Sequence, residues 1–141
     1  IYTKGATLLH TLRQMINDDE KWRAILTGLN TAFYHKTVTT AAIENYISQQ
    51  SGLNLKPFFD QYLRTVQIPT LEYYFEDNKF AYRWINAIPG FNMYLKVKLD
   101  GNEQWIKPTT NWTHEYTNET KNELIIDSNF YVASFKNMIN K

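Results

Sequence analysis

The sequence predicts an α+β fold in which a four-helix subdomain is followed by a small antiparallel β-sandwich of about seven strands. Up to Val66, apolar residues recur every three or four positions, which is the spacing of an amphipathic helix. From Leu71 onward they alternate with polar residues, as in a half-buried strand. Hydrophobic residues make up 43% of the 141 residues, which is enough for a real core. We expect a helical subdomain at residues 1–67 and a β-sandwich domain at residues 68–141.

Four segments of the first half carry apolar residues on one helical face. Their stripes are Leu8, Leu9, Leu12, Met15 and Ile16; then Trp22, Ile25, Leu26, Leu29 and Phe33; then Ile43, Tyr46 and Ile47; and last Leu55, Phe58, Phe59, Tyr62, Leu63 and Val66. Gly28 lies within the second segment, where a glycine costs ~1 kcal/mol relative to alanine. We therefore expect another helix to pack closely against Gly28.

The ends of these helices carry residues with capping chemistry. The acidic run Asp18-Asp19-Glu20 suits the start of the second helix, where the helix dipole favours negative charge. Thr40 is the expected N-cap of the third helix, and Gly52 is its expected stop. Asn54 is the expected cap of the fourth helix. Pro57 then falls in the first turn, where its missing N–H costs nothing.

The second half predicts short strands separated by turns. The expected strands are Leu71–Glu76, Lys79–Trp84, Tyr94–Leu99, Glu103–Lys107, His114–Tyr116, Glu123–Ile126 and Tyr131–Phe135. A turn at Asp77-Asn78 separates the first two strands. Asp100-Gly101 is a strong signal for a two-residue hairpin. We expect the strands to pair in antiparallel fashion and to form a sandwich.

Composition disfavours several classes of function. The chain has 15 basic and 14 acidic residues, and neither half carries the basic excess that a phosphate backbone selects. Nucleic acid is therefore not an expected partner. The chain has no cysteine, which excludes disulfides and thiolate metal sites. No run of residues approaches the ~18 apolar residues of a membrane span.

The three histidines do not form a metal-binding motif. His10, His35 and His114 have no histidine at i+4, and none belongs to an H-E-x-x-H run. A zinc site built from them would have to span both subdomains. We interpret them as polar residues at helix edges and in a loop, and we expect no metal site in this chain itself.

Aromatic residues make up 16% of the chain and suggest one alternative function. Trp84 falls on the inward face of its strand, so core packing explains it. Trp105 and Trp112 have no such assignment, and exposed tryptophans on a sandwich can stack on sugars. Residues 70–141 would then be an interaction or carbohydrate-binding module. This alternative predicts an exposed Trp105 or Trp112 and tryptophan fluorescence that changes with glycans.

Several blocks of sequence resemble the aminopeptidase N-like zinc metallopeptidases. The blocks are Tyr2-x-Lys4-Gly5-Ala6 followed by Leu8-Leu9-His10-x-Leu12-Arg13; Trp22; Thr39-Thr40; Ser51-Gly52-Leu53-Asn54-Leu55-Lys56-Pro57-Phe58-Phe59-Asp60-Gln61-Tyr62-Leu63; and Ile68-Pro69-Thr70-Leu71. The match covers about residues 1–72 and depends on the shared order and spacing of the blocks. Asn54 replaces the usual aspartate of the family and Tyr62 the usual tryptophan. Residues 73–141 are similar to the family's small β-sandwich domain more loosely.

The resemblance implies a role for the first residues of the chain. Members of this family bind one zinc ion through H-E-x-x-H and a downstream glutamate, and the glutamate of that motif is the general base. The tyrosine of the Y-x-K-G position donates its hydroxyl to the oxyanion of the tetrahedral intermediate. Tyr2 occupies that position, and a phenol with a pKa of ~10 keeps its proton at neutral pH. Lys4 and Gly5 would serve positioning and helix packing.

The same resemblance implies that the zinc ligands, the base and the amine-binding glutamates lie in sequence preceding Ile1. We therefore expect the chain to be the helical tail of a thermolysin-like catalytic domain plus the following β domain, inactive alone. A catalytically dead scaffold member of the family is a further alternative. Helix faces that met the zinc-bearing part would be uncovered, so we expect an exposed apolar patch near the chain start and self-association through it.

Overall fold

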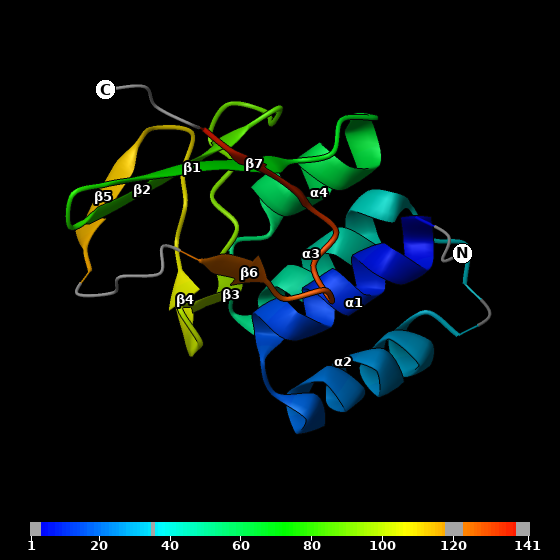
Figure 1. The fold of residues 1–141 in the computed structure, drawn as a ribbon. Coiled ribbons are helices and arrows are strands. Elements are labelled where there is room, and N and C mark those ends of the chain that lie inside the picture. Colours follow the sequence, from blue (N-terminus) through cyan, green and yellow to red (C-terminus); the bar gives the residue numbers. More distant parts are fainter. Residues whose placement is uncertain (1–3, 35, 118–122, 138–141) are drawn as a thin grey trace.

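The predicted α+β architecture is confirmed in the computed structural model, which describes residues 4–34, 36–117 and 123–137, with side chains described from Leu8 onward. The described helices all precede the strands (Figure 1). They are α1 (Lys4–Ile16), α2 (Asp19–Ala32), α3 (Thr40–Ser51) and α4 (Lys56–Arg64). Within the described residues, no helix has both the length and the apolar character needed to cross a membrane.

The strands form two sheets. They are β1 (Thr70–Glu76), β2 (Lys79–Ile85), β3 (Leu95–Leu99), β4 (Asn102–Ile106), β5 (Thr113–Tyr116), β6 (Leu124–Ile126) and β7 (Ala133–Lys136). One sheet has the order β5-β2-β1-β7 and the other the order β4-β3-β6. The β3–β4 hairpin turns at Asp100 and Gly101, whose φ angles of 49° and 88° match the predicted two-residue turn.

The expectation of a wholly antiparallel sandwich is wrong for one pair of strands. β7 lies parallel to β1, with Thr70 opposite Ala133 and Tyr73 opposite Lys136. The reason is the path of residues 127–132, which return from the three-stranded sheet to the start of β1. There the N–H of Ala133 donates to the carbonyl of Pro69 at 2.9 Å, so β7 begins beside the beginning of β1.

One buried core joins the two sheets to the helices. The four-stranded sheet contributes Phe80, Tyr82 and Trp84 from β2, all at most 2% exposed. The three-stranded sheet contributes Leu95, Val97 and Leu99 from β3. The helices contribute Leu12, Phe58, Phe59 and Tyr62 to the same cluster, and the N-cap of α4 contributes Leu55. The change from helix to strand falls between Arg64 and Thr70, but the buried residues run on across it.

Two expected caps lie one residue away from the observed ones. Thr39, not Thr40, is the N-cap of α3, and its side chain accepts a hydrogen bond from the N–H of Ala42 at 3.1 Å. Two adjacent threonines satisfy the same pattern, and only the backbone decides which is extended. Leu55, not Asn54, is the N-cap of α4 and makes no side-chain cap. Asn54 Oδ1 still accepts from the N–H of Lys56 at 3.4 Å.

Gly28 has the close helix contact that the sequence predicts. A β-carbon built on Gly28 of α2 would overlap the hydroxyl of Tyr46 on α3. The Tyr46 ring also packs edge-on against Phe33, with ring centroids 5.8 Å apart. The glycine therefore lets α2 approach α3 at the point where the tyrosine crosses it.

The buried side chains of Gln61 and Tyr62 connect α4 to the sheets. Gln61 is fully buried; its Oε1 accepts from the N–H of Ile88 at 2.6 Å and its Nε2 donates to the carbonyl of Gln67 at 3.2 Å. The hydroxyl of Tyr62 donates to the carbonyl of Tyr131 at 2.7 Å. These bonds fix both the connection after α4 and the segment that leads into β7.

We predict that Gly28→Ala destabilises the protein by about 1–3 kcal/mol, because the added methyl group overpacks the contact with Tyr46. Urea unfolding of Gly28→Ala, Tyr46→Phe and the double variant measures the coupling. Removal of the hydroxyl should restore part of the loss. The interpretation fails if Gly28→Ala stabilises the protein by the ~1 kcal/mol of an open helical site in both backgrounds.

We predict that Gln61→Met lowers the free energy of unfolding by about 2–4 kcal/mol, because it leaves the Ile88 N–H and the Gln67 carbonyl without their partner. Gln49→Met on the exposed side of α3 is the matched control and should change stability by about 0.5 kcal/mol or less. Equal urea midpoints for the two variants would show that the buried amide is dispensable.

Candidate functional site

The candidate catalytic residue Tyr2 lies outside the described residues. Lys4 begins α1 and Gly5 follows within its first turn. The structure shows how the helix that Lys4 and Gly5 begin is anchored.

The middle of helix α1 is held by buried contacts. Thr11 and Leu12 are at most 1% exposed. The Thr11 hydroxyl donates to the carbonyl of Asn129 at 3.3 Å and accepts from the N–H of Tyr131 at 2.9 Å. The segment that leads into β7 thus fixes α1 at Thr11 from the sheet side.

The end of α1 is tied to the start of α2 by an exposed ion pair. Arg13 Nε and Nη2 donate to the two carboxylate oxygens of Asp19 at 2.9 and 3.0 Å. The hydrogen bond from Arg13 lowers the pKa of Asp19 below its usual value. Because the pair is open to solvent, it contributes little to stability and serves mainly to orient the corner.

The described residues do not bring the histidines together. His10 is exposed on α1, and His114 on β5 lies 3.3 Å from the hydroxyl of Tyr74. His35 lies outside the described residues. Across residues 4–34, 36–117 and 123–137, no group of three or more histidine, aspartate or glutamate side chains is arranged to hold a metal ion.

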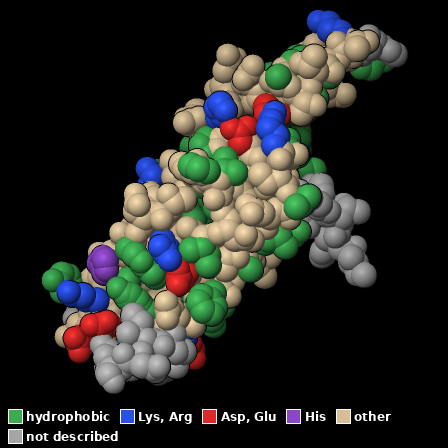
Figure 2. All heavy atoms as spheres, turned by 90° about the horizontal axis from the view of Figure 1, so that it is seen from above, with side chains coloured by type: hydrophobic (Ala, Val, Ile, Leu, Met, Phe, Trp, Pro, Cys, Tyr) green, Lys and Arg blue, Asp and Glu red, His purple; other side chains and the backbone are tan. Residues whose placement is uncertain are grey.

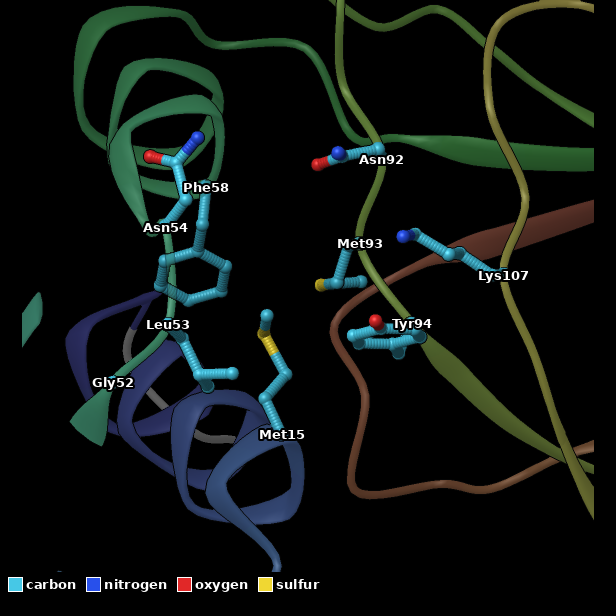
Figure 3. A pocket seen from close by; sticks show the side chains of 9 residues that line it. All are labelled: Met15, Gly52, Leu53, Asn54, Phe58, Asn92, Met93, Tyr94 and Lys107. Atoms are coloured by element: carbon cyan, nitrogen blue, oxygen red, sulfur yellow. The ribbon is translucent and has the colours of Figure 1, made fainter.

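A pocket of about 250 Å³ lies at the seam between the helices and the sheets (Figure 3). We call it the seam pocket. It is lined by Met15, Gly52, Leu53, Asn54, Phe58, Asn92, Met93, Tyr94 and Lys107. Figure 3 shows Met15, Leu53 and Phe58 on the helical side, while Asn92 and Lys107 reach across from the sheet side toward α4.

Buried aromatic residues position the floor of the seam pocket. Trp84 Nε1 donates to the carbonyl of Met93 at 3.3 Å, and the Tyr62 hydroxyl lies 4.0 Å from the Met93 sulfur. Burial raises the pKa of Tyr62 well above its usual value, so this hydroxyl stays protonated and acts as a donor. Met93 is therefore held on two sides by core residues.

The charge of the seam pocket comes from Lys107. Its Nζ lies 5.1 Å from the centroid of the Tyr94 ring, a cation–π contact that turns the ammonium over the pocket. None of the nine lining residues is acidic. Among the described residues, no carboxylate forms an ion pair with Lys107.

The tryptophans separate into buried and exposed side chains. Trp84 is 1% exposed, which confirms its assignment to the core. Trp112 is half-buried, with the Arg83 guanidinium 4.6 Å from its ring centroid and Tyr74 packed edge-on. Trp105 is 38% exposed on β4, so it remains the candidate stacking residue of the carbohydrate-binding alternative.

A second titratable pair lies at the edge of the four-stranded sheet. The Tyr82 hydroxyl donates to Glu115 across β2 and β5. Burial, followed by this contact, raises the pKa of Tyr82 above its usual value.

On the face shown in Figure 2, basic and acidic side chains are interspersed, with no continuous area of one sign.

Sequence reasoning missed the seam pocket. Its walls come from the end of α1, the α3–α4 connection with the first turn of α4, the segment before β3 and the residue after β4, which are far apart in the sequence. No local pattern signals such a site.

No protein-family model matches the chain, and no curated protein is significantly similar to it.

Proposed function

We propose that the chain is the helical tail of the catalytic domain of a zinc-dependent aminopeptidase, followed by that enzyme's small β-sandwich domain. The observation that carries the proposal is the order and spacing of the blocks from Tyr2 to Leu71. The parent enzyme would hydrolyse N-terminal residues from peptides. Its catalytic polypeptide would precede Ile1 and would be the main partner of this chain.

The fold offers support at the positions where the blocks fall. Ser51 and Gly52 end α3, and Gly52 adopts a left-handed φ of 74°. Phe58, Phe59 and Tyr62 form the buried face of α4. The two departures from the family pattern are also compatible with its structural needs, because Tyr62 keeps a buried aromatic ring with a donor and Asn54 keeps an acceptor at the start of α4.

In this proposal Tyr2 stabilises negative charge. Its neutral hydroxyl donates a hydrogen bond to the oxyanion that develops on the scissile carbonyl, and α1 supplies the rigid support. The described residues of this chain do not fit zinc, since they form no ligand set, so we assign no step to the metal. Lys4 and Gly5 position the tyrosine and have no chemical role.

We predict that Tyr2→Phe in the complete enzyme lowers kcat roughly a hundredfold to a thousandfold, because one oxyanion donor is lost. Zinc content and KM should change little. Tyr116→Phe, at a side chain that is 85% exposed, is the matched control and should leave kcat unchanged. Release of a chromogenic amine from an aminoacyl substrate measures the rates.

Three results would contradict this proposal. One is full turnover by the Tyr2→Phe enzyme. Another is a coding sequence upstream of Ile1 that lacks H-E-x-x-H, which would leave a catalytically dead scaffold or the interaction module. The third is zinc-dependent release of N-terminal amino acids by the purified 141-residue chain.

The proposal also assigns a partner surface to the helices. Leu9 on α1 and Leu26 on α2 are 48% and 43% exposed. An open cavity of about 380 Å³ between α2 and α3 is lined by Leu26, Leu29, Asn30, Phe33 and Ile43. We propose that the catalytic polypeptide covers this face in the parent enzyme.

We predict that the isolated 141-residue chain self-associates through this face. Leu26→Asp should weaken association, because a charge would be buried in the contact, whereas Leu63→Asp, at an exposed side chain of α4, should not. Sedimentation velocity over a range of concentrations measures the effect. A chain that stays monomeric at the highest soluble concentration would show that the face needs no cover.

A further inference from the structure

The seam pocket differs from the other charged cavities of the described residues in the balance of its charge. The cavity at the α1–α2 corner contains Arg13, which is paired with Asp19. The cavity on the three-stranded sheet contains Lys96 and Lys98, but also Glu103 and Asp127. In the seam pocket Lys107 has no acidic neighbour in the lining. Its positive charge is therefore available to a ligand.

We propose that the seam pocket binds a small amphipathic carboxylate, in which one apolar group of about the size of a leucine side chain is joined to a single carboxylate. This site is separate from the position assigned to Tyr2. The inference does not rest on the peptidase proposal, since it uses only residues from Met15 to Lys107.

The apolar half of the ligand follows from the walls of the pocket. Met15, Leu53 and Phe58 line the helical side of the pocket, and Met93 adds an apolar side chain from the segment before β3 (Figure 3). Phe58 and Met93 are each 2% exposed and belong to the core, so their positions are fixed. Met15 is only partly buried, and its flexible thioether can adapt to different apolar groups. A branched or aromatic group would exchange water for these contacts.

The anionic half follows from the polar groups across from the helical side. Lys107 is held over the pocket by the Tyr94 ring, and the side-chain amide of Asn92 reaches toward the same space. An ammonium and an amide N–H both donate to a carboxylate, and the bond from the charged donor is the stronger one. A ligand cation would meet Lys107 with no compensating carboxylate in the lining and is disfavoured.

The volume of the seam pocket narrows the class of ligand further. Pockets for drug-sized ligands span roughly 300–1,000 Å³. At about 250 Å³ the seam pocket is smaller, which suits a single amino-acid residue or a short branched acid. It is also only partly enclosed, so the rest of a longer molecule could extend into solvent.

The test uses N-acetyl-L-leucine as the probe and N-acetyl-L-leucinamide as its neutral partner. Both are titrated into the 141-residue chain while amide chemical shifts are followed by NMR. The acid should bind at least tenfold more tightly than the amide, and the shifts should centre on Gly52, Leu53 and Met93. Inorganic phosphate, which lacks an apolar group, should bind more weakly than the acid.

Two variants locate the contact. Lys107→Met keeps the length of the side chain and removes its charge, so it should weaken the acid about tenfold or more and leave the amide unchanged. Lys98→Met, at an exposed lysine outside the pocket lining, should leave both affinities unchanged. Lys107→Arg should retain most of the affinity for the acid. It also provides the comparison if Lys107→Met folds poorly, because loss of acid binding in Lys107→Arg would overturn the role of a cation here.

The inference is overturned if the acid and the amide bind equally, because the site would then be only an apolar hollow. It is overturned equally by unchanged acid affinity in Lys107→Met, by phosphate binding as tightly as the acid, or by the absence of shifts with the acid at saturating concentrations. A measurable preference for the acid that depends on Lys107 supports it.

Discussion

The relation between the helices and the sheets depends on the buried polar side chains at the end of α4. Gln61 makes three hydrogen bonds in the core, to Thr65, to the carbonyl of Gln67 and from the N–H of Ile88. The carbonyl of Gln67 lies between α4 and β1, and the N–H of Ile88 lies between β2 and β3, so neither group has a partner from a regular helix or strand. The side-chain amide of Gln61 satisfies both groups from inside the protein, because its nitrogen donates and its oxygen accepts. An apolar side chain of the same volume could fill the space, but it could not make those hydrogen bonds.

The aromatic core extends this connection in both directions. The ring centroid of Tyr62 lies 4.9 Å from that of Phe58 and 6.2 Å from that of Phe91. The ring centroids of Trp84 and Phe91 are 5.2 Å apart. Such tilted and edge-on arrangements suit the charge distribution of aromatic rings. Two of these rings also donate hydrogen bonds: the Tyr62 hydroxyl to the carbonyl of Tyr131, and Trp84 Nε1 to the carbonyl of Met93. The seam pocket thus owes the position of its floor to the core, which is why we regard it as a formed site.

The return of the chain after β6 gives the structure its second link. The segment that precedes β7 is bonded to Thr11 on one side and to Tyr62 on the other, before β7 pairs in parallel with β1. Helix α1 is therefore braced by residues that lie more than a hundred positions later in the chain. This bracing connects the two proposals, since it steadies both the helix that follows Tyr2 and the Met15 wall of the seam pocket.

The sequence by itself determined the local elements. The change of period near Val66 placed the switch from helix to strand, the Asp100-Gly101 pair fixed a hairpin, and Gly52 marked the end of α3, because spacing and backbone freedom are properties of neighbouring residues. The helical face of Trp22 and Ile25 and the inward face of Trp84 were also predictable. The tertiary structure alone decided that Tyr46 fills the space beside Gly28, that β7 runs parallel to β1, and that Thr39 and Leu55 take the cap positions. It alone brought Lys107 to face Phe58. These features depend on which distant segments meet, and that choice is made by the burial of the whole core, which no local pattern encodes.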